Sequence, residues 1–321
     1  MEERMAHEEK IPFKGIYTGK LRRYFDWQNF IDPFRILLGF FQSIFLLKKY
    51  KPHIIFAKGG YVSVPVCFAA FLLRIPIIIH ESDVVPGLAN KILAKLAKKV
   101  CISFEKTKQY FPYGILTGSP VREELKPKDR VQEEEWSKKA YTITKFNPQI
   151  PTILVLGGSL GAQSLTQKIY EIFPAFEGKA QFILQTGKGK LDTSYNACPY
   201  LKQYEYIGDD LKYFYQIADI VISRAGANTI SELALLGKAA ILVPLGTQGS
   251  RGDQIVNAQM LEEKDAVFVK PDNENSQRLL RDITKLLRDP SYRRHLERNI
   301  EQFSPKGAGK AIAEIILETV H

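Results

Sequence analysis

The sequence predicts an α/β protein composed of two doubly wound halves. Short apolar runs typical of buried strands alternate with helical patterns of about ten residues, which indicates βαβ units and parallel sheets. This alternation stops between Val121 and Pro151 and then starts again. The length of 321 residues fits two domains, since a typical domain has ~100–200 residues.

Each half can be divided into elements by the length and period of its apolar pattern. In the first half, the expected strands are residues 15–18, 53–57, 75–79, 99–102 and 115–117, and the expected helices are residues 33–50, 63–73 and 87–96. In the second half, the expected strands are residues 153–156, 181–185, 203–207, 220–223, 240–243 and 266–269, and the expected helices are residues 161–173, 211–217, 228–236, 254–263 and 277–287.

The break between the halves is highly charged and ends in a proline, so we interpret it as an interdomain connection that carries a short helix. We therefore expect an amino-terminal domain over residues 1–145 and a second domain over residues 146–305. A carboxyl-terminal helix, residues 306–321, is expected to join the first domain.

The charge balance favours anionic partners. Lys and Arg number 45 against 35 Asp and Glu, a net charge of +10, which is compatible with phosphorylated ligands, nucleic acid or acidic lipid. No recognition helix or RNP-like motif supports nucleic acid. The three cysteines lack metal-site spacing, and no H-E-x-x-H, EF-hand or D-x-D pattern occurs, so neither a metal nor a cofactor is expected.

Two strand–loop–helix junctions in the second half have the composition of phosphate sites. The string ILVLGGSLGAQ, residues 153–163, runs from a strand through glycines into a helix, and Ser159 could add a hydroxyl donor. The string IVISRAGANTISE, residues 220–232, is a second such junction. Glu232 could accept both hydroxyls of a ribose or simply complement the helix dipole. Each junction could equally be a tight turn without a ligand.

Other polar residues follow strands or open helices. Asp253 and Gln254, in GTQGSRGDQIVNA, suit sugar hydroxyls, although a solvated helix cap is the alternative. Arg122, at the end of TGSPVR, could reach an anion or lie on the surface.

The segment PFRILLGFFQSIFLLKKY, residues 33–50, is apolar on nearly all sides and ends in two lysines. It is either a buried core helix or a helix that places aromatic side chains in a bilayer surface beside acidic head groups. The second interpretation concerns Phe40, Phe41, Phe45, Lys48 and Lys49. No run reaches the ~18 uninterrupted apolar residues of a membrane-spanning helix.

Taken in order along the chain, these motifs resemble the bacterial MurG family of UDP-N-acetylglucosamine–N-acetylmuramyl-(pentapeptide) pyrophosphoryl-undecaprenol N-acetylglucosamine transferases. The matching strings are GGYVS, IPIIIHESDVVPGLANK, TGSPVR, GGSLGAQ, SRAGANTISELA and GDQIVNA. The resemblance implies a GT-B fold, with two Rossmann-like domains that face a cleft.

The resemblance also implies residue roles, with the donor UDP-N-acetylglucosamine (UDP-GlcNAc) in the second domain. The residues implied for the nucleotide and diphosphate are Ser159, Arg122, Ala227, Asn228, Thr229, Ile230 and Ser231. Glu232 would bind the ribose, the Gly208 backbone would lie beside the uracil, and Asp253 with Gln254 would contact the sugar. Asp83, where the family often has Asn, is a further sugar candidate. Gly59, Gly60 and Tyr61 join the 33–50 segment as membrane or acceptor residues.

The implied reaction is transfer of N-acetylglucosamine from UDP-GlcNAc to lipid I, which gives lipid II for peptidoglycan synthesis, with inversion and without a metal. The protein would act peripherally at the cytoplasmic face of the bacterial plasma membrane. A glycolipid synthase acting on diacylglycerol and a catalytically silent nucleotide-sugar-binding membrane protein are the alternatives.

One family feature is absent from the sequence. The family's amino-terminal strand and Gly-rich GGTGGH loop, whose His is the favoured general base, have no counterpart here, so the catalytic residue is unknown. We therefore expect that the chain is amino-terminally incomplete and has little or no transferase activity, because loss of a general base alone costs ~10²–10⁴-fold in rate.

Overall fold

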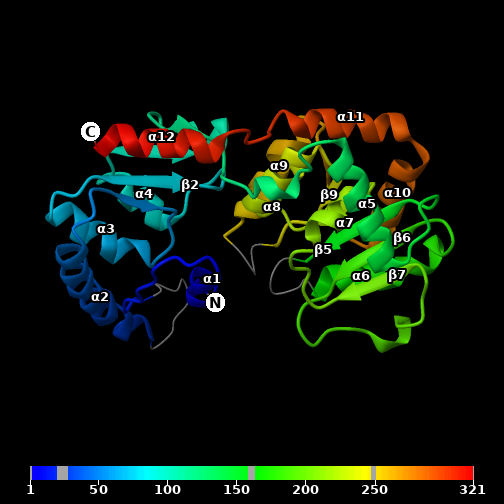
Figure 1. The fold of residues 1–321 in the computed structure, drawn as a ribbon, viewed down its shortest axis with the longest axis horizontal. Helices are drawn as coiled ribbons and strands as arrows, with labels where there is room; N and C mark the ends of the chain where they lie inside the picture. Colours follow the sequence, from blue (N-terminus) through cyan, green and yellow to red (C-terminus); the bar gives the residue numbers. More distant parts are fainter. Residues whose placement is uncertain (1, 20–27, 158–162, 247–250, 321) are drawn as a thin grey trace. The chain divides into compact units, whose positions relative to one another are not determined.

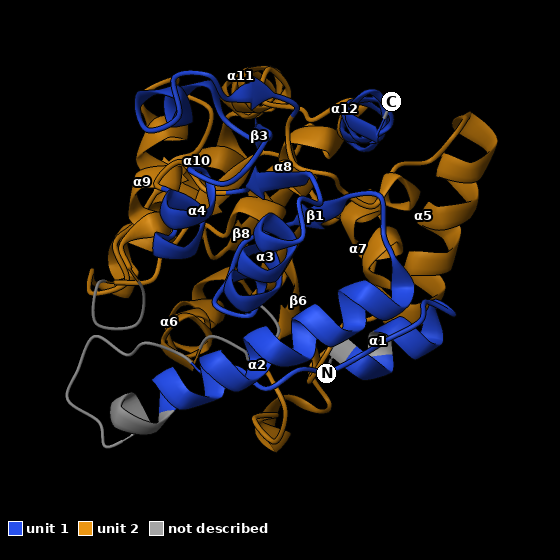
Figure 2. Cartoon of the chain, turned by 90° about the vertical axis from the view of Figure 1, so that its left-hand side faces the viewer, with its two compact units in different colours: residues 1–82, 86–117, 309–321 blue, residues 83–85, 118–308 orange. Residues whose placement is uncertain are grey.

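The chain forms two compact α/β units in a computed structural model that describes residues 2–19, 28–157, 163–246 and 251–320 (Figure 1). Unit 1 comprises Met1–Ser82, Pro86–Thr117 and Gly309–His321, and unit 2 comprises Asp83–Val85 and Gly118–Ala308 (Figure 2).

Unit 1 contains one sheet, and helices lie on both of its faces. Its elements are α1 (Glu2–Glu8), α2 (Gln28–Tyr50), β1 (Ile55–Ala57), α3 (Ser63–Leu72), β2 (Ile77–Glu81), α4 (Leu88–Leu93), β3 (Lys99–Ile102), the 3₁₀ turn η1 (Glu105–Gln109), β4 (Ile115–Leu116) and α12 (Ala308–Val320). The four strands are parallel and follow the order β1-β2-β3-β4.

Strand β2 shows how this sheet is covered. Successive side chains of a strand point to opposite faces. Ile77 and Ile79 pack in a core with residues of α2, α3 and α4, whereas Ile78 packs with α12 through Ile312 and Ile315. Burial on both faces requires a continuous apolar run, which explains the sequence IPIII before His80.

Unit 2 contains a larger sheet with more helices. Its elements are the 3₁₀ turn η2 (Glu123–Leu125), α5 (Arg130–Thr144), β5 (Thr152–Leu156), α6 (Gln163–Ile172), η3 (Phe173–Phe176), β6 (Gln181–Gln185), η4 (Thr193–Tyr195), β7 (Leu201–Tyr204), α7 (Leu211–Ile217), β8 (Ile220–Ser223), α8 (Ala227–Leu236), β9 (Ala240–Leu242), α9 (Asp253–Glu262), β10 (Phe268–Val269), α10 (Ser276–Arg288) and α11 (Pro290–Glu301).

The sheet of unit 2 has the strand order of a dinucleotide-binding fold. Its six parallel strands run β10-β9-β8-β5-β6-β7. When the strands are numbered along unit 2 and read from β7, this is the order 3-2-1-4-5-6. The direction of winding reverses between the first and fourth strands. Those strands are β5 and β8, which pair directly, with Leu154 opposite Val221. The fold class predicted from the sequence, two Rossmann-like α/β domains, is thus confirmed.

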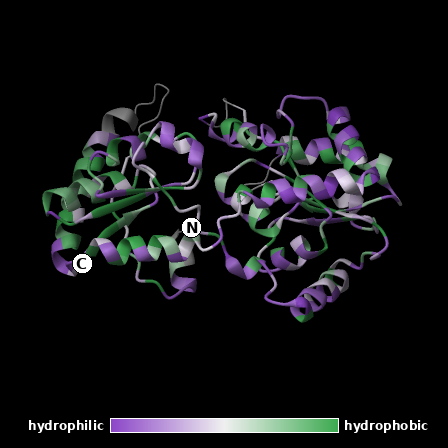
Figure 3. Cartoon of the chain, turned by 90° about the horizontal axis from the view of Figure 1, so that it is seen from above, coloured by the Kyte–Doolittle hydropathy of each residue, from purple (hydrophilic) through white to green (hydrophobic). Residues whose placement is uncertain are grey.

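The core of unit 2 contains the central strand β5 and the helices that cover it. Ile153 and Val155 of β5 lie in one cluster with side chains of α6 and α10, including Ile169 and Ile283. In Figure 3, the strands of both units are mostly coloured as hydrophobic, whereas the helices carry a mixture of hydrophobic and hydrophilic residues. The central strands β2, β5 and β8 are fully buried, which agrees with their apolar composition.

The structure differs from the sequence expectations in several elements, and helices α1 and α11 were not expected at all. Residues 15–18, expected to form a strand, have no strand partner and are irregular. The charged segment expected to be a short-helix connection forms α5, a helix of 15 residues whose Asp129 cap accepts from the backbone N–H of Gln132. Trp136 of α5 packs edge-to-face on Tyr213 of α7, with ring centroids 5.9 Å apart.

The boundary between the units lies at Gly118 rather than at residue 145, because α5 packs with α7 in unit 2. Gly118 has a φ of 78°, and a Cβ at this position would lie 2.9 Å from the Cβ of Pro305. The turn therefore depends on glycine and directs the chain toward Arg122. Helix α12 lies with unit 1.

Candidate functional site

The carboxyl ends of β5 and β8 lie side by side at the centre of the sheet in unit 2. β8 ends at Ser223 and is followed by Arg224 and the first residue of α8, Ala227. Ser159, a predicted phosphate contact, follows β5 in the sequence and lies outside the described residues. This reversal point in strand order is where open parallel sheets bind ligands.

Helix α8 begins with a turn that suits an anion. Its N-cap, Gly226, is extended, with φ −70° and ψ 142°, and has no side chain that could accept from the first backbone N–H groups. Those N–H groups have no carbonyl partner within the helix and form the positive end of its dipole. The turn can therefore donate hydrogen bonds to a phosphate.

The predicted run Ala227–Ser231 contributes mainly through this backbone. Asn228 is exposed and Thr229 is half-buried, but the side chains of Ile230 and Ser231 are buried. The hydroxyl of Ser231 donates to the carbonyl of Ala227 over 2.8 Å. The first turn of the helix is thus the part that can reach a ligand.

Glu232, in the second turn of α8, is contacted by residues from two other segments. Nη2 of Arg122 lies 3.2 Å from Oε1, and the hydroxyl of Tyr215 donates to Oε2 over 3.3 Å. The Arg122 side chain is 55% exposed, whereas Tyr215 of α7 is fully buried. Arg122 and Glu232, two separate sequence candidates, therefore form one ion pair.

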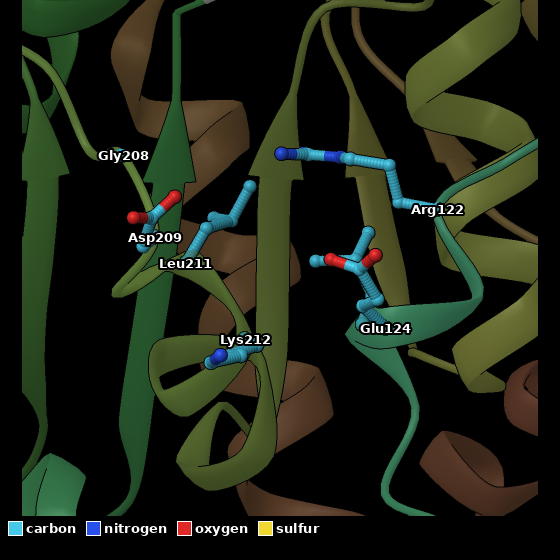
Figure 4. Close-up of a pocket in the computed structure, with 7 residues that line it drawn as sticks. Arg122, Glu124, Gly208, Asp209, Leu211 and Lys212 are labelled. Atoms are coloured by element: carbon cyan, nitrogen blue, oxygen red, sulfur yellow. The ribbon is translucent and has the colours of Figure 1, made fainter. Parts of the chain in front are cut away.

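A cavity of about 260 Å³ adjoins Arg122 (Figure 4). It is lined by Arg122, Glu124, Leu125, Gly208, Asp209, Leu211 and Lys212. Figure 4 shows that the Arg122 side chain extends across the cavity from one side, and that Gly208 and Asp209 lie on the opposite side. The two sequence candidates Arg122 and Gly208 thus line the same hollow.

The candidates for the sugar form a second polar group in unit 2. Asp83 accepts from Nδ2 of Asn257 over 2.9 Å and lies 3.6 Å from a guanidinium nitrogen of Arg251. Arg251 also lies 3.8 Å from Asp253, the first residue of α9. The Oε1 atom of Gln254 accepts from the backbone N–H of Leu245. Arg251 thus connects Asp83 with Asp253.

Asn257 links this second group to the start of α8. Besides its bond to Asp83, it donates to the carbonyl of Ala225 over 3.3 Å, two residues before α8 begins. The sugar candidate Asp83 is therefore connected through the buried Asn257 to the segment that precedes α8.

Comparisons with known proteins identify the family to which the chain belongs. Residues 152–315 match the glycosyltransferase family 28 C-terminal domain, and residues 1–102 match the corresponding N-terminal domain. A curated relative from Lachnospira eligens is 42% identical over 308 residues, which is 95% of this chain and 85% of the relative. It is named UDP-N-acetylglucosamine–N-acetylmuramyl-(pentapeptide) pyrophosphoryl-undecaprenol N-acetylglucosamine transferase.

The chain belongs to the MurG family. A relative of the same name from Clostridium novyi is 38% identical and covers 98% of this chain and 86% of its own length. Among solved structures, MurG from Acinetobacter baumannii aligns with a TM-score of 0.75 and 26% identity over 99% of this chain and 88% of that one. A UDP-GlcNAc 2-epimerase from Neisseria meningitidis shares the fold, with a TM-score of 0.65 and 16% identity, over 92% of this chain and 83% of that one.

The membrane candidates on α2 fall into an exposed group and a half-buried residue. Phe41 and Phe45 are 60% and 67% exposed, and Lys48 and Lys49 are exposed as well. Phe40 instead is half-buried and packs against the core formed with α3 and α4. One face of this helix therefore packs in the core of unit 1, and the other face is exposed.

The GGYVS string of unit 1 forms the loop after β1. Gly59 and Gly60 have φ values of 85° and 81°, and a Cβ on Gly59 would lie 2.8 Å from the amide of Asn90. The loop conformation thus requires these glycines. Tyr61, at its end, is 45% exposed.

Sequence reasoning missed a buried charge cluster beside the start of α6. Arg224, 7% exposed, lies 2.9 Å from Asp272, and it also donates to Ser164 and to the carbonyl of Val243. Burial alone would raise the pKa of Asp272, but hydrogen bonds and charge from Arg224, with help from Ser164 and Lys168, hold this pKa below its usual value. The isolated arginine after β8 was the available signal. Across the described residues, no group of three or more His, Cys, Asp or Glu side chains is arranged to hold a metal ion.

Proposed function

We propose that this chain transfers N-acetylglucosamine from UDP-GlcNAc to lipid I and so forms lipid II. The proposal rests mainly on the ion pair between Arg122 and Glu232. Glu232 lies in the second turn of α8, the helix that follows β8 at the reversal point of the sheet in unit 2. Relatives that match most of the chain are named for this transfer.

Unit 2 would bind the donor nucleotide. The first-turn N–H groups of α8 and the guanidinium of Arg122 would bind the diphosphate, and Glu232 would accept from the ribose hydroxyls. Uracil would lie in the hollow beside Gly208. These donors would also stabilise the charge that develops on the departing UDP, the kind of fixed electrostatic contribution that dominates many enzymes.

The sugar would contact α9. Asp253 and Gln254 would bind hydroxyl groups of the N-acetylglucosamine, and Asp83 would add a further acceptor. Arg251 balances the negative charge of Asp83, and Asn257 donates a hydrogen bond to it. A carboxylate at this position, where the family often has an amide, can therefore still accept from a sugar hydroxyl. Direct displacement with inversion at the anomeric carbon follows from a single attack on the bound donor.

Unit 1 would contact the membrane through the exposed face of α2. Phe34, Leu37, Phe41 and Phe45 recur at intervals of three or four residues, which places them on one side of the helix, and each is at least 52% exposed. Lysines follow at the end of the helix, where acidic head groups would attract them. In the parts of the chain that the structure describes, no helix is long and apolar enough to cross a membrane.

The identity of the product tests the proposal. Purified protein is incubated with radiolabelled UDP-GlcNAc and vesicles that contain both lipid I and diacylglycerol. Because no GGTGGH loop occurs in the sequence, the acceptor that carries the label, rather than the rate, is the readout. We expect label in lipid II alone. Label on diacylglycerol would favour the glycolipid synthase, and binding of UDP-GlcNAc without any transfer would favour a catalytically silent binding protein.

A further inference from the structure

The two partners of Glu232 differ in how firmly they are held. The Arg122 side chain is 55% exposed and reaches Glu232 from an extended segment before η2. An ion pair made by such a solvent-accessible arginine is weak and is screened by salt. Tyr215 instead is 1% exposed and belongs to α7, with the neighbouring side chain of Phe214 also fully buried.

The protonation of Tyr215 makes it a permanent donor. Burial raises the pKa of Tyr215 well above its usual value, the charge of Glu232 and their hydrogen bond raise it further, and Arg122 lowers it only in part. The phenol therefore stays protonated at physiological pH. An ionised carboxylate can only accept, so the hydrogen bond must run from Tyr215 to Oε2 of Glu232.

We propose that Tyr215 is a positioning residue for ribose recognition, and that Arg122 is the exchangeable partner of the same carboxylate. This inference rests on the proposed binding of UDP-GlcNAc. Tyr215 fixes the orientation of Glu232 before the ligand arrives, which leaves the remaining acceptor positions of the carboxylate directed at the ribose. The ribose hydroxyls take the place of Arg122 at Oε1, and the released guanidinium becomes available to the diphosphate.

The inference predicts a specific change in nucleotide selectivity. If Tyr215 acts through Glu232, removal of its hydroxyl weakens the contacts to the ribose hydroxyls and leaves the contacts to uracil and phosphate unchanged. A purely structural role would instead weaken all nucleotides equally. The ratio of affinities for UDP and 2′,3′-dideoxy-UDP, which lacks both ribose hydroxyls, separates these cases, and it does not depend on the fraction of active protein because both ligands are titrated into one preparation.

The test compares wild type, Tyr215→Phe and Tyr213→Phe by calorimetry. Tyr213 is the matched control, because it lies in the same helix but packs on Trp136. For Tyr215→Phe we expect UDP affinity to fall about three- to tenfold with little change for 2′,3′-dideoxy-UDP, since one hydrogen bond is at stake. Tyr213→Phe should keep the wild-type ratio. In a Glu232→Gln background, Tyr215→Phe should not lower the ratio further.

Two outcomes are to be distinguished. If wild type binds UDP and 2′,3′-dideoxy-UDP equally, Glu232 does not bind the ribose hydroxyls and that part of the proposed function fails. If wild type discriminates but Tyr215→Phe keeps the full ratio, only the positioning by Tyr215 is overturned. A parallel loss of affinity for both nucleotides has the same meaning, since it indicates a structural tyrosine.

Discussion

Asn257 and Asp83, separated by 174 residues in the sequence, are hydrogen-bonded to each other over 2.9 Å within unit 2. The Oδ1 atom of Asn257 also accepts from the backbone N–H of Val84 over 3.0 Å. The fully buried Asn257 thus satisfies both a side chain and a backbone group of the short segment Asp83–Val85.

We expect Asn257→Ala to lower the free energy of unfolding by roughly 2–3 kcal/mol, because the buried N–H of Val84 would lose its acceptor. Affinity for UDP-GlcNAc should fall more than affinity for UDP, since Asp83 is a candidate for the sugar. Urea unfolding and calorimetry measure the two effects. Gln259→Ala, at an exposed position of the same helix, is the control and should change neither quantity. Unchanged stability of Asn257→Ala would show that the segment is held by other contacts.

Acid should destabilise unit 2 through Asp272. Its pKa is lower in the folded state, so its contribution to stability is complete above the unfolded pKa of ~3.9 and is lost as pH falls through the folded pKa. Asp272→Asn should cost about 3 kcal/mol near neutral pH, because Arg224 would keep a buried charge without its counter-ion. It should also flatten the acid limb of a plot of stability against pH. An acid limb identical to that of wild type would assign the effect to other carboxylates.

The three thiols should differ in reactivity. Burial raises the pKa of Cys67 to about 11, and burial likewise raises the pKa of Cys101 to about 11 although Lys99 lowers it slightly. Cys198 is half-buried. Because the thiolate is the reactive form, a disulfide reagent at pH 8 should modify Cys198 quickly in the native protein and all three thiols after denaturation. Rapid modification of Cys67 would contradict its place in the core of unit 1.

Much of unit 2 could be predicted from the sequence, because its central strands β5, β8 and β9 are fully buried and consist mainly of apolar residues. Residues 153–156 and 220–223 were predicted close to the observed β5 and β8. Residues 15–18 have a similar local pattern, but a strand also requires a pairing partner, which no local pattern reveals. Helix α5 was underestimated because its charged residues conceal one apolar face with Trp136 and Ala140.

The predicted site residues were those that follow strands or open helices, where local sequence carries a signal. Their supporting contacts could not be predicted in the same way. Tyr215 lies in an ordinary helical pattern, and Asn257 acts on a segment that is far away in the sequence. Such pairings depend on the tertiary fold, so the chain gives no short-range indication of them.

The two faces of α2 give opposite predictions for similar substitutions. Phe41→Asp with Phe45→Asp should leave the Tm nearly unchanged, because both rings are exposed, and should reduce binding to vesicles that contain anionic lipid. Phe40→Asp is the contrasting variant and should destabilise unit 1 by about 3 kcal/mol or more, because it places a charge against the core. Vesicle co-sedimentation at low and high salt, with Tm measured in parallel, checks both. Full membrane binding by the double variant would remove α2 from the docking surface.

The central claim is that unit 2 binds a UDP-sugar through Glu232, and calorimetric titration of UDP into wild type and Glu232→Ala tests it most directly. Loss of charge-assisted bonds to the ribose should cost about 1.5–3 kcal/mol, a ten- to hundredfold loss of affinity. EDTA should have no effect, and Glu134→Ala, an exposed glutamate on α5, should bind as wild type does. Equal affinity of wild type and Glu232→Ala would contradict the assignment of the ribose site, and loss of wild-type binding in EDTA would contradict binding without a metal.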